Sequence, residues 1–476
     1  MNYKIYSKNK VSHFIDVECE IENINTNTIE LQLPAWRPGR YELQNFAKNI
    51  QNLDVFDEKN NLLSTKKVSK DRWEVSCNGA TTITAKYNYY ANTINAGSSF
   101  VDENVFYVNP VNLCIYAEGR INESCNLYLQ IADNEQIAGA SFQNAAKSDV
   151  NTIHFHDFFH LADTPFIISV NLKHDFYNIG KVKFNLWFQG NFSREYLKQI
   201  KTDFKKFSQE QIKVFGNFPE KDYHFITWVL PVPYYHGVEH RNSTMQILGP
   251  DSQNFEELYT DLLGLASHEL FHTWNICKIR PIELLPYDFT KENYFQTCFV
   301  AEGVTTYYGD LMLYRSGVFD RNQYLKELEA CYKRHFDHAD SAAQSLVESS
   351  WDLWLDGYSQ SIPNRKVSVY HKGAISAQIL DLHIQKVSNK TRSLDDVMKL
   401  MWKVFGKSTN GTPLLGYTMQ DYKNICEQIA GEPLDWYFEK CILGKESLFD
   451  LLNEYLQLID LQVVRNEEGL VNLKII

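Results

Sequence analysis

The 476-residue sequence is long enough for two or more domains, and its 44% of hydrophobic residues can supply a core for each. A net charge of -12 and the lack of a long Lys/Arg run disfavour a surface that follows nucleic-acid phosphates. No apolar run approaches the ~18 residues that a membrane-spanning helix needs. We therefore expect a globular protein that binds neither nucleic acid nor a membrane.

The N-terminus and the cysteines predict a cytoplasmic location. The first residues alternate in polarity almost at once and lack the apolar core of a signal peptide. The nine cysteines are odd in number and form no CxxC pair, which favours reduced thiols over a disulfide framework. The sequence carries no signal for an oligomeric state.

Residues 1–188 predict a β domain. Apolar and polar residues alternate over segments such as 15–21, 29–33 and 73–77, and Asn and Gly separate these segments. A period of two is typical of strands that bury one face. We expect an antiparallel β-sandwich-like domain here.

Residues 189–455 predict a mainly helical domain. Ser193 is a suitable N-cap for a helix that ends near Gly216. Further helices are expected over residues 255–275, 293–316, 321–338, 371–387, 394–405 and 419–430. Residues 224–235 predict a strand, for which Pro231 and Pro233 favour an edge position. Residues 456–476 predict a C-terminal hairpin, so the fold class is α+β.

The stretch HELFH, residues 268–272, suggests a metal site. If it is helical, His268 and His272 lie one turn apart, about 6 Å along the axis, so that both imidazoles can reach one ion. The alternative is a pair of core histidines that only form hydrogen bonds. The surrounding residues are almost all apolar, and burying two imidazoles and the carboxylate of Glu269 among them is costly unless a cation satisfies them. The motif therefore favours metal binding.

A catalytic zinc keeps three protein ligands and one open position, so a third ligand is required. The best candidate is Glu302 on a second predicted helix, because its neighbours in FVAEGV are apolar or small. The alternative for a single helical glutamate is exposure to solvent. Zinc held in this way lowers the pKa of a bound water to about 7. Glu269 can then act as the general base, and the chemistry expected is hydrolysis of an amide.

Several motifs together resemble the glycyl aminopeptidase family of zinc metallopeptidases, relatives of the thermolysin-like aminopeptidases. They are HELFHTWNICKIRP, VAEGVTTYYGD, GVEHRNST and VYHKGA, and LPAWRPGRYELQNFAKNI at residues 33–50 resembles that family's N-terminal domain. The resemblance spans nearly the whole chain. It implies an N-terminal β domain, a thermolysin-like catalytic domain and one zinc ion per chain. Many members continue into a PDZ-like module, which we do not expect in a sequence that ends at Ile476.

The resemblance also implies roles for individual residues. His268, His272 and Glu302 match the zinc ligands and Glu269 matches the general base, in agreement with the residues themselves. Glu239 matches the glutamate that grips the free α-amino group of a peptide substrate. Tyr370, which precedes a Lys-Gly pair by one residue, matches the tyrosine that stabilises the oxyanion.

The first substrate pocket departs from the family pattern. The family usually has two small residues before the amine-binding glutamate, whereas this sequence has His236 and then Gly237. The imidazole argues against strict selection of N-terminal glycine, and small residues such as Gly and Ala remain the expected preference. The implied substrates are peptides with a free N-terminus.

Two other functions compatible with the sequence are hydrolysis of a non-peptide substrate by the same zinc, and a binding role with a silent site. Two further features have weaker signals. The segment HFHDFFH offers His154, His156 and His160 as a possible second metal site. Asp310 is a possible partner for a zinc-bound imidazole, or else a surface carboxylate.

Overall fold

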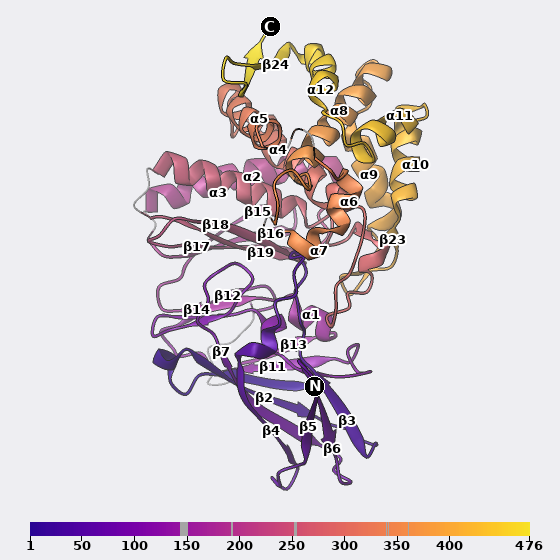
Figure 1. Cartoon of the computed structure of the whole chain (residues 1–476). Helices are drawn as coiled ribbons and strands as arrows, with labels where there is room; N and C mark the ends of the chain where they lie inside the picture. The colour runs from indigo at the N-terminus through magenta and orange to yellow at the C-terminus, as the bar shows by residue number, and fades with distance from the viewer. Residues whose placement is uncertain (143–150, 192–193, 252–254, 339, 341, 360) are drawn as a thin grey trace.

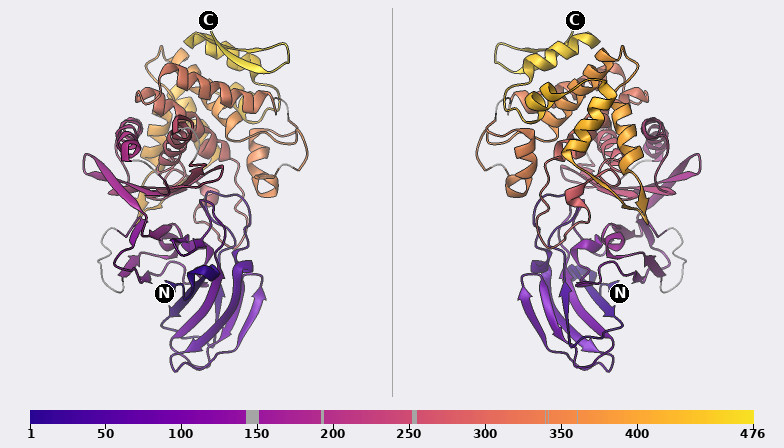
Figure 2. Two further views of the ribbon diagram at one scale, coloured as in Figure 1. Left: turned by 90° about the vertical axis from the view of Figure 1, so that its left-hand side faces the viewer. Right: turned by 90° about the vertical axis from the view of Figure 1, so that its right-hand side faces the viewer.

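The computed structural model describes residues 1–476 except 143–150, 192–193, 252–254, 339, 341 and 360. It has a β-rich N-terminal part and a mainly helical C-terminal part, which confirms the α+β class (Figure 1). A five-stranded sheet lies where the two parts meet, and the chain ends at the far end of the helical part (Figures 1 and 2). The predicted N-cap Ser193 lies outside the described residues.

Three sheets form the β-rich part and share a large apolar core. The six-stranded sheet has the order β13 (Asn151–Phe155), β11 (Cys125–Leu129), β1 (Asn2–Tyr6), β2 (Phe14–Ile21), β7 (Ile83–Tyr90), β4 (Ile50–Asp57). The second sheet has the order β10 (Tyr116–Ala117), β3 (Thr28–Gln32), β6 (Arg72–Ser76), β5 (Thr65–Ser69). The third has the order β12 (Gln136–Gly139), β14 (Phe166–Ser169), β9 (Val105–Val108), β8 (Phe100–Val101). Pairing is antiparallel except between β1 and β11, which run parallel.

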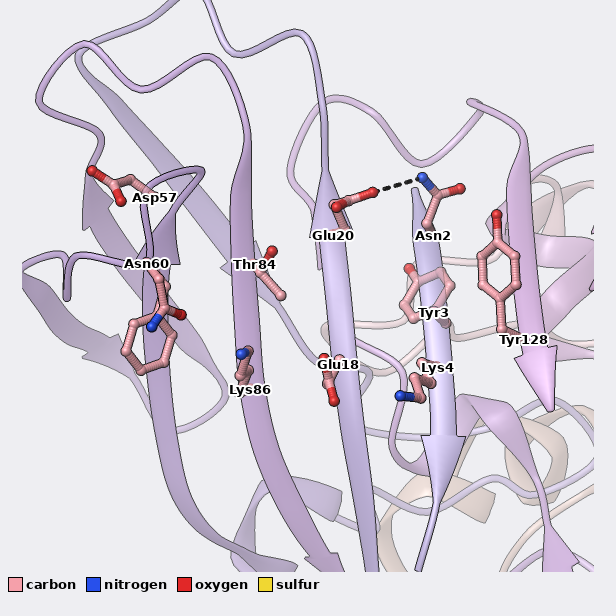
Figure 3. Close-up of a pocket in the computed structure, with 11 residues that line it drawn as sticks. Asn2, Tyr3, Lys4, Glu18, Glu20, Asp57, Asn60, Thr84, Lys86 and Tyr128 are labelled. Atoms are coloured by element: carbon pink, nitrogen blue, oxygen red, sulfur yellow. Dashed lines mark hydrogen bonds between the residues drawn. The ribbon is translucent and has the colours of Figure 1, made fainter. Parts of the chain in front are cut away.

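The six-stranded sheet has one dry and one wet face because its residues alternate in polarity. Tyr3 and Val17 are buried on the core side. Between such residues, Lys4, Glu18 and Lys86 lie in one row across three strands, and Figure 3 shows them on the outer face, where they line a pocket. Opposite charges on neighbouring strands are a favourable cross-strand arrangement. This face is therefore adapted to solvent, and the core face packs on the rest of the β domain.

The five-stranded sheet begins the C-terminal part. Its order is β15 (Lys173–Ile179), β16 (Val182–Gln189), β17 (Asp222–Val229), β19 (Ser243–Gly249), β18 (Tyr234–His240). The edge position expected for residues 224–235 is wrong, because β17 lies between β16 and β19 and the two prolines fall in the connection to β18. The edge strand is β18, which runs antiparallel to β19. The domain boundary at 188/189 stays a prediction, and β16 pairs with β17 across it.

Helices cover this sheet on the side away from the β-rich part (Figure 1). The longer ones are α2 (Arg194–Phe215), α3 (Phe255–Phe271), α4 (Thr305–Arg315), α5 (Arg321–Phe336), α8 (His371–Val387), α9 (Leu394–Phe405), α10 (Met419–Ala430) and α12 (Phe449–Leu456). The shorter ones include α1 (Phe158–Ala162), α6 (Leu346–Trp351), α7 (Leu353–Asp356), α11 (Asp435–Tyr437) and the π-helical turn η5 (Phe299–Val304). The C-terminal hairpin forms from β24 (Leu461–Arg465) and β25 (Val471–Ile475).

The helix expected over 293–316 starts later than predicted. Residues 293–297 form no helix, because the Asn293 side chain donates to the carbonyls of Asp288 and Lys291 at 2.8 Å each and holds a loop there. The helical segment then opens as η5 and continues as α4. All nine cysteines are free, as expected. Within the described part of the chain, no helix combines the length and apolarity needed to cross a bilayer.

The segments η5 and α8 touch backbone to backbone. A Cβ atom added to Gly303 would lie 2.5 Å from the Cα of Gly373 and 2.8 Å from the carbonyl oxygen of Val369. Only glycine permits this approach. The contact places the start of α8, and with it Tyr370, beside the segment that carries Glu302.

We predict that Gly303→Ala lowers the stability of the protein, because its methyl group must push η5 and α8 apart. Overpacking of this kind costs ~1–3 kcal/mol. The matched control is Gly264→Ala in α3, where the nearest atom to an added Cβ is Oδ1 of Asp310 at 3.8 Å. There the methyl group has room, and the helix should gain about 0.5–1 kcal/mol. Thermal unfolding midpoints should move in opposite directions, and equal midpoints would contradict the role of the glycine contact.

Candidate active site and metal centre

Two imidazoles lie one turn apart at the C-terminal end of α3. The Nε2 atoms of His268 and His272 are 3.0 Å apart. Leu270 and Phe271 between them are fully buried, and the two imidazoles lie on the face of the helix that these side chains do not occupy. A Cβ atom added to Gly309 of α4 would lie 3.5 Å from the Cβ of His268, which shows how closely α4 packs on the backbone there. The site is thus built on the contact between α3 and the segment that leads into α4.

The orientation of His272 is set by a backbone carbonyl. Its Nδ1 lies 2.9 Å from the carbonyl oxygen of Asn275. Because a carbonyl can only accept, Nδ1 carries the proton and Nε2 of the neutral ring keeps its lone pair. In the turn that contains Asn275, the next residue, Ile276, has a φ of 104, a conformation that costs a β-branched residue roughly 1–3 kcal/mol. The turn therefore holds the imidazole ready to act as a ligand.

Glu302, the third ligand expected from the sequence, lies within reach of both imidazoles. Its Oε2 is 3.3 Å from Nε2 of His272 and 3.6 Å from Nε2 of His268. Asn275 fixes this arrangement, because its side-chain amide donates to the carbonyl of Val300 at 2.8 Å and to the hydroxyl of Thr305 at 3.0 Å. One buried side chain thereby ties the end of α3 to the segment that carries the glutamate.

Burial and mutual charge shift the pKa values of this group strongly. Burial disfavours a charged imidazole, but Glu302, Glu239 and Glu269 outweigh it and raise the pKa of His272 to about 10. Burial disfavours a charged carboxylate too, yet the two histidines lower the pKa of Glu302 to about 2. The site therefore strongly favours positive charge between its carboxylates.

The ligand atoms of His268, His272 and Glu302 fit one metal ion. Atoms that bind one zinc tetrahedrally at about 2.1 Å lie ~3.4 Å from each other. The three observed separations, 3.0, 3.3 and 3.6 Å, bracket that value. Two imidazole nitrogens and one carboxylate oxygen are also the donor set that suits such an ion. The three residues could therefore hold one metal ion.

Glu269 lies beside this group with its side chain pressed against β18. It is 5% exposed, and its Oε2 has no hydrogen-bond partner among the described residues. A Cβ atom added to Gly237 would lie 2.4 Å from its Oε1, so only glycine leaves room for it. Burial raises the pKa of Glu269 well above its usual range, and Glu239 and Glu302 add to the effect while His272 opposes it. A carboxyl group in this setting is suited to accept and return a proton.

The edge strand β18 sends its side chains to two sides. Gly237 and Glu239 face the C-terminal part of α3. Glu239, Glu269 and His272 offer ligand atoms within 4.8 Å of one another. His236 points instead toward the β-rich part, where its Nδ1 accepts a hydrogen bond from the backbone amide of Ala96 at 3.2 Å. Its role in a substrate pocket stays a prediction, and the strand register separates it from the carboxylates.

Tyr370 directly precedes α8 and packs on the same side of the site as Glu302. It is half-buried and joins the small apolar cluster around Cys298 and Ala301 on η5. Burial raises the pKa of its hydroxyl well above the usual range, with the charge of Glu302 contributing. The hydroxyl therefore keeps its proton and can serve as a hydrogen-bond donor.

The β-rich part completes the site with residues to which sequence analysis gave no individual role. The hydroxyl of Tyr41, which is 2% exposed, donates to Oε1 of Glu302 at 3.4 Å. A Cβ atom added to Gly39 would lie 2.5 Å from Oε2 of Glu239. Both residues belong to the stretch 33–50, whose resemblance to the family's N-terminal signature was the available signal. Because both residues are far in sequence from Glu302 and Glu239, no local pattern could predict these contacts.

The weaker candidates have different outcomes. Within the described residues, both groups able to hold a metal lie at the site above, and neither includes His154, His156 or His160. The rings of His156 and His160 stack at 5.3 Å instead. The structure records no hydrogen bond between Asp310 and His268 in the part that it describes. Burial raises the pKa of Asp310 to about 7.

The fold is shared with two-domain metallopeptidases. Two solved structures share this fold at low identity. An M1 zinc metallopeptidase from Deinococcus radiodurans has a TM-score of 0.57 at 12% identity over 94% of each chain. A mutant M1 zinc metallopeptidase from the same organism, bound to a Tyr-Ser-Ala substrate, has a TM-score of 0.55 at 13% identity over 94% of each chain.

The family follows from two models and a nearer structure. The Peptidase M61 N-terminal domain matches residues 2–170, and the M61 glycyl aminopeptidase model matches residues 261–376. A crystal structure described as an aminopeptidase N family protein from Idiomarina loihiensis has a TM-score of 0.90 at 30% identity, over 98% of this chain and 79% of that one. No curated protein matches the sequence. The chain belongs to the M61 glycyl aminopeptidase family and is a peptidase.

We predict that Tyr41→Phe weakens metal binding about tenfold, the lower end of the effect expected when a partner of a ligand is lost. The hydroxyl that holds Oε1 of Glu302 would be missing while the three ligands remain. Competition against a chelator measures the affinity. The matched control is Tyr6→Phe, whose hydroxyl donates to Oε1 of Glu18 at 2.9 Å on the six-stranded sheet. An affinity equal to that of the control would contradict the role of Tyr41.

Proposed function

We propose that this chain is a zinc-dependent aminopeptidase that removes single N-terminal residues, small ones preferentially, from peptides with a free N-terminus. One observation carries the proposal. Two groups of ligand atoms, those of His268, His272 and Glu302 and those of Glu239, Glu269 and His272, each lie within 4.8 Å and share His272. A group that could hold a metal and the carboxylates of Glu239 and Glu269 thus adjoin, which supports cleavage one residue from a charged end.

His268, His272 and Glu302 would hold one zinc ion per chain. When bound, zinc polarises a carbonyl and lowers the pKa of a coordinated water. The protein contributes the fixed tautomer of His272 and the hydrogen bond from Tyr41 to Glu302. These partners keep the ligands oriented before the substrate arrives.

Glu269 is the proposed general base. Its buried carboxylate takes the proton from the attacking water and returns it to the leaving amine. The raised pKa of Glu269 supports both transfers, because a carboxylate of higher pKa is the stronger base toward the water and can still release the proton to the amine. The hydroxyl of Tyr370 donates a hydrogen bond to the carbonyl oxygen as negative charge develops there.

Glu239 is the proposed anchor for the α-ammonium group. A charge-assisted hydrogen bond in a half-buried cleft favours a free amine strongly over a peptide nitrogen. The exposed edge of β18 offers backbone groups with which an extended peptide can pair. Gly237 and Gly39 pack directly against the carboxylates of Glu269 and Glu239. The preference for small N-terminal residues rests on the family.

We predict that Glu269→Gln keeps its metal but loses at least about 10²-fold in turnover, the contribution of a positioned general base. The amide is isosteric with the carboxylate but cannot accept the proton. Hydrolysis of alanyl and glycyl nitroanilides measures turnover, and elemental analysis measures zinc. Glu18→Gln on the outer face of the six-stranded sheet controls for the change in charge. Activity equal to that of the control would remove the base assignment.

We predict that acetylation of the peptide N-terminus abolishes hydrolysis and that Glu239→Gln reduces kcat/KM for free peptides at least about tenfold, since a charge-assisted contact is lost. The Gln variant should also discriminate less between free and acetylated peptides. Product analysis by mass spectrometry measures both. Efficient cleavage of acetylated peptides by the unaltered protein would refute an aminopeptidase and leave a different hydrolase.

A further inference from the structure

A second cavity, of about 310 Å³, lies at the junction of the two parts of the chain. Its walls come from α1 and the residues beside it, and from residues in the segment 277–289 that follows α3. The hairpin of β21 (Ser408–Thr409) and β22 (Thr412–Pro413) completes them. His268, His272, Glu302, Glu269 and Glu239 are not among the described residues that line it. The cavity therefore differs from the metal centre.

Among the described residues, one guanidinium in this cavity has no acidic partner. Arg280 donates from Nε to the carbonyl of Ile276 at 3.3 Å and from Nη2 to that of Cys277 at 3.2 Å, and it stacks on Tyr287 at 4.1 Å. Of the described carboxylates, none forms an ion pair with it. A guanidinium has five N–H donors in a fixed plane, so three remain for a ligand. The stacking holds that plane in place.

The other charged groups of the cavity already have partners. The two oxygens of Asp163 face Nδ1 of His240 at 2.8 Å and the backbone amide of Arg241 at 3.0 Å. Asp157 accepts from the backbone amide of His160 at 2.8 Å and so caps α1. Nε of Arg241 faces Glu220 at 3.5 Å. The hydrogen bonds of Asp157 and Asp163 are thus directed elsewhere, and Arg280, with Arg241 beside it, is the group of the cavity that can receive an anion.

Part of the remaining wall is apolar and aromatic, and the rest is polar, with Asn122, His160, Thr409, Asn410 and Thr412. Phe159, Phe289 and Pro286 line the cavity together with Tyr287. A bare inorganic anion would leave these walls without a partner, whereas an organic anion can cover them. A volume near 300 Å³ lies at the small end of ligand pockets. The chemistry thus favours a compact molecule with one carboxylate and one apolar group.

We propose that this cavity binds a small organic carboxylate, with its charge on Arg280 and its apolar part against Phe159 and Phe289. The ligand would lie next to Pro38, and a Cβ atom added to the following residue, Gly39, would lie 2.5 Å from Oε2 of Glu239. A planar carboxylate matches a guanidinium fork with two parallel hydrogen bonds. The site does not depend on the metal, and its test is independent of the proposed peptidase reaction.

We predict that the full-length protein binds N-acetylphenylalanine at least about tenfold more tightly than N-acetylphenylalaninamide, measured by calorimetry. The acetyl group prevents capture of either probe by Glu239. Arg280→Met should remove the preference for the acid. Arg465→Met, which removes one positive charge from the distant C-terminal hairpin, should retain it.

Two further measurements keep the outcome decisive. Thr412→Phe places a ring inside the cavity and leaves both arginines intact, so it should abolish binding even where Arg280→Met fails to fold. Binding of the acid should also survive removal of metal with a chelator. Equal binding of acid and amide overturns the proposal. So does a preference that persists in both variants, or one that disappears with the metal, because the acid would then bind at the metal centre.

Discussion

The charge buried between α3 and η5 is the constraint on which the rest of this structure depends. Two imidazoles and two carboxylates lie among apolar side chains, where unpaired charge costs several kcal/mol for each group. The favourable solution is a cation at the point where His268, His272 and Glu302 converge. Everything that holds α3 against η5 therefore also sets the geometry of the ligands. The buried amide of Asn275 and the glycine contact between Gly303 and Gly373 act on this interface.

The β-rich part belongs to this site as much as the helices do. Its residues 33–50 cross to the helical part, where the indole of Trp36 donates to the carbonyl of Asp288 at 2.7 Å. From there Gly39 and Tyr41 reach Glu239 and Glu302. A domain that contacts both a proposed metal ligand and the proposed amine anchor cannot move without changing the site. We therefore expect the proposed activity to require the interface between the two parts.

The sequence predicted the parts of the site that lie close together along one helix. His268, Glu269 and His272 follow from helical spacing, and Glu302 follows from a carboxylate among apolar neighbours. It did not predict contacts between distant segments. Tyr41 reaches Glu302 across 261 positions, and no local pattern records such a contact. The two prolines predict an edge strand only if they lie within the strand. They lie after β17, so they place no restriction on its position in the sheet. The late start of η5 goes with the Asn293 side chain, which holds residues 288–293 in a loop through the carbonyls of Asp288 and Lys291.

The period of two in β18 explains how one strand serves two environments. Gly237 and Glu239 face α3, where a side chain larger than hydrogen at 237 would strike Glu269. His236 and Val238 face the β-rich part, where burial lowers the pKa of His236 to about 3 and keeps it neutral beside the charge of Arg37. A shift of one residue in the register with β19 would exchange these faces and bury a glutamate in the apolar cluster around Val238. The pairing of β18 with β19 therefore determines which side chains meet the metal centre, before any contact with substrate is made.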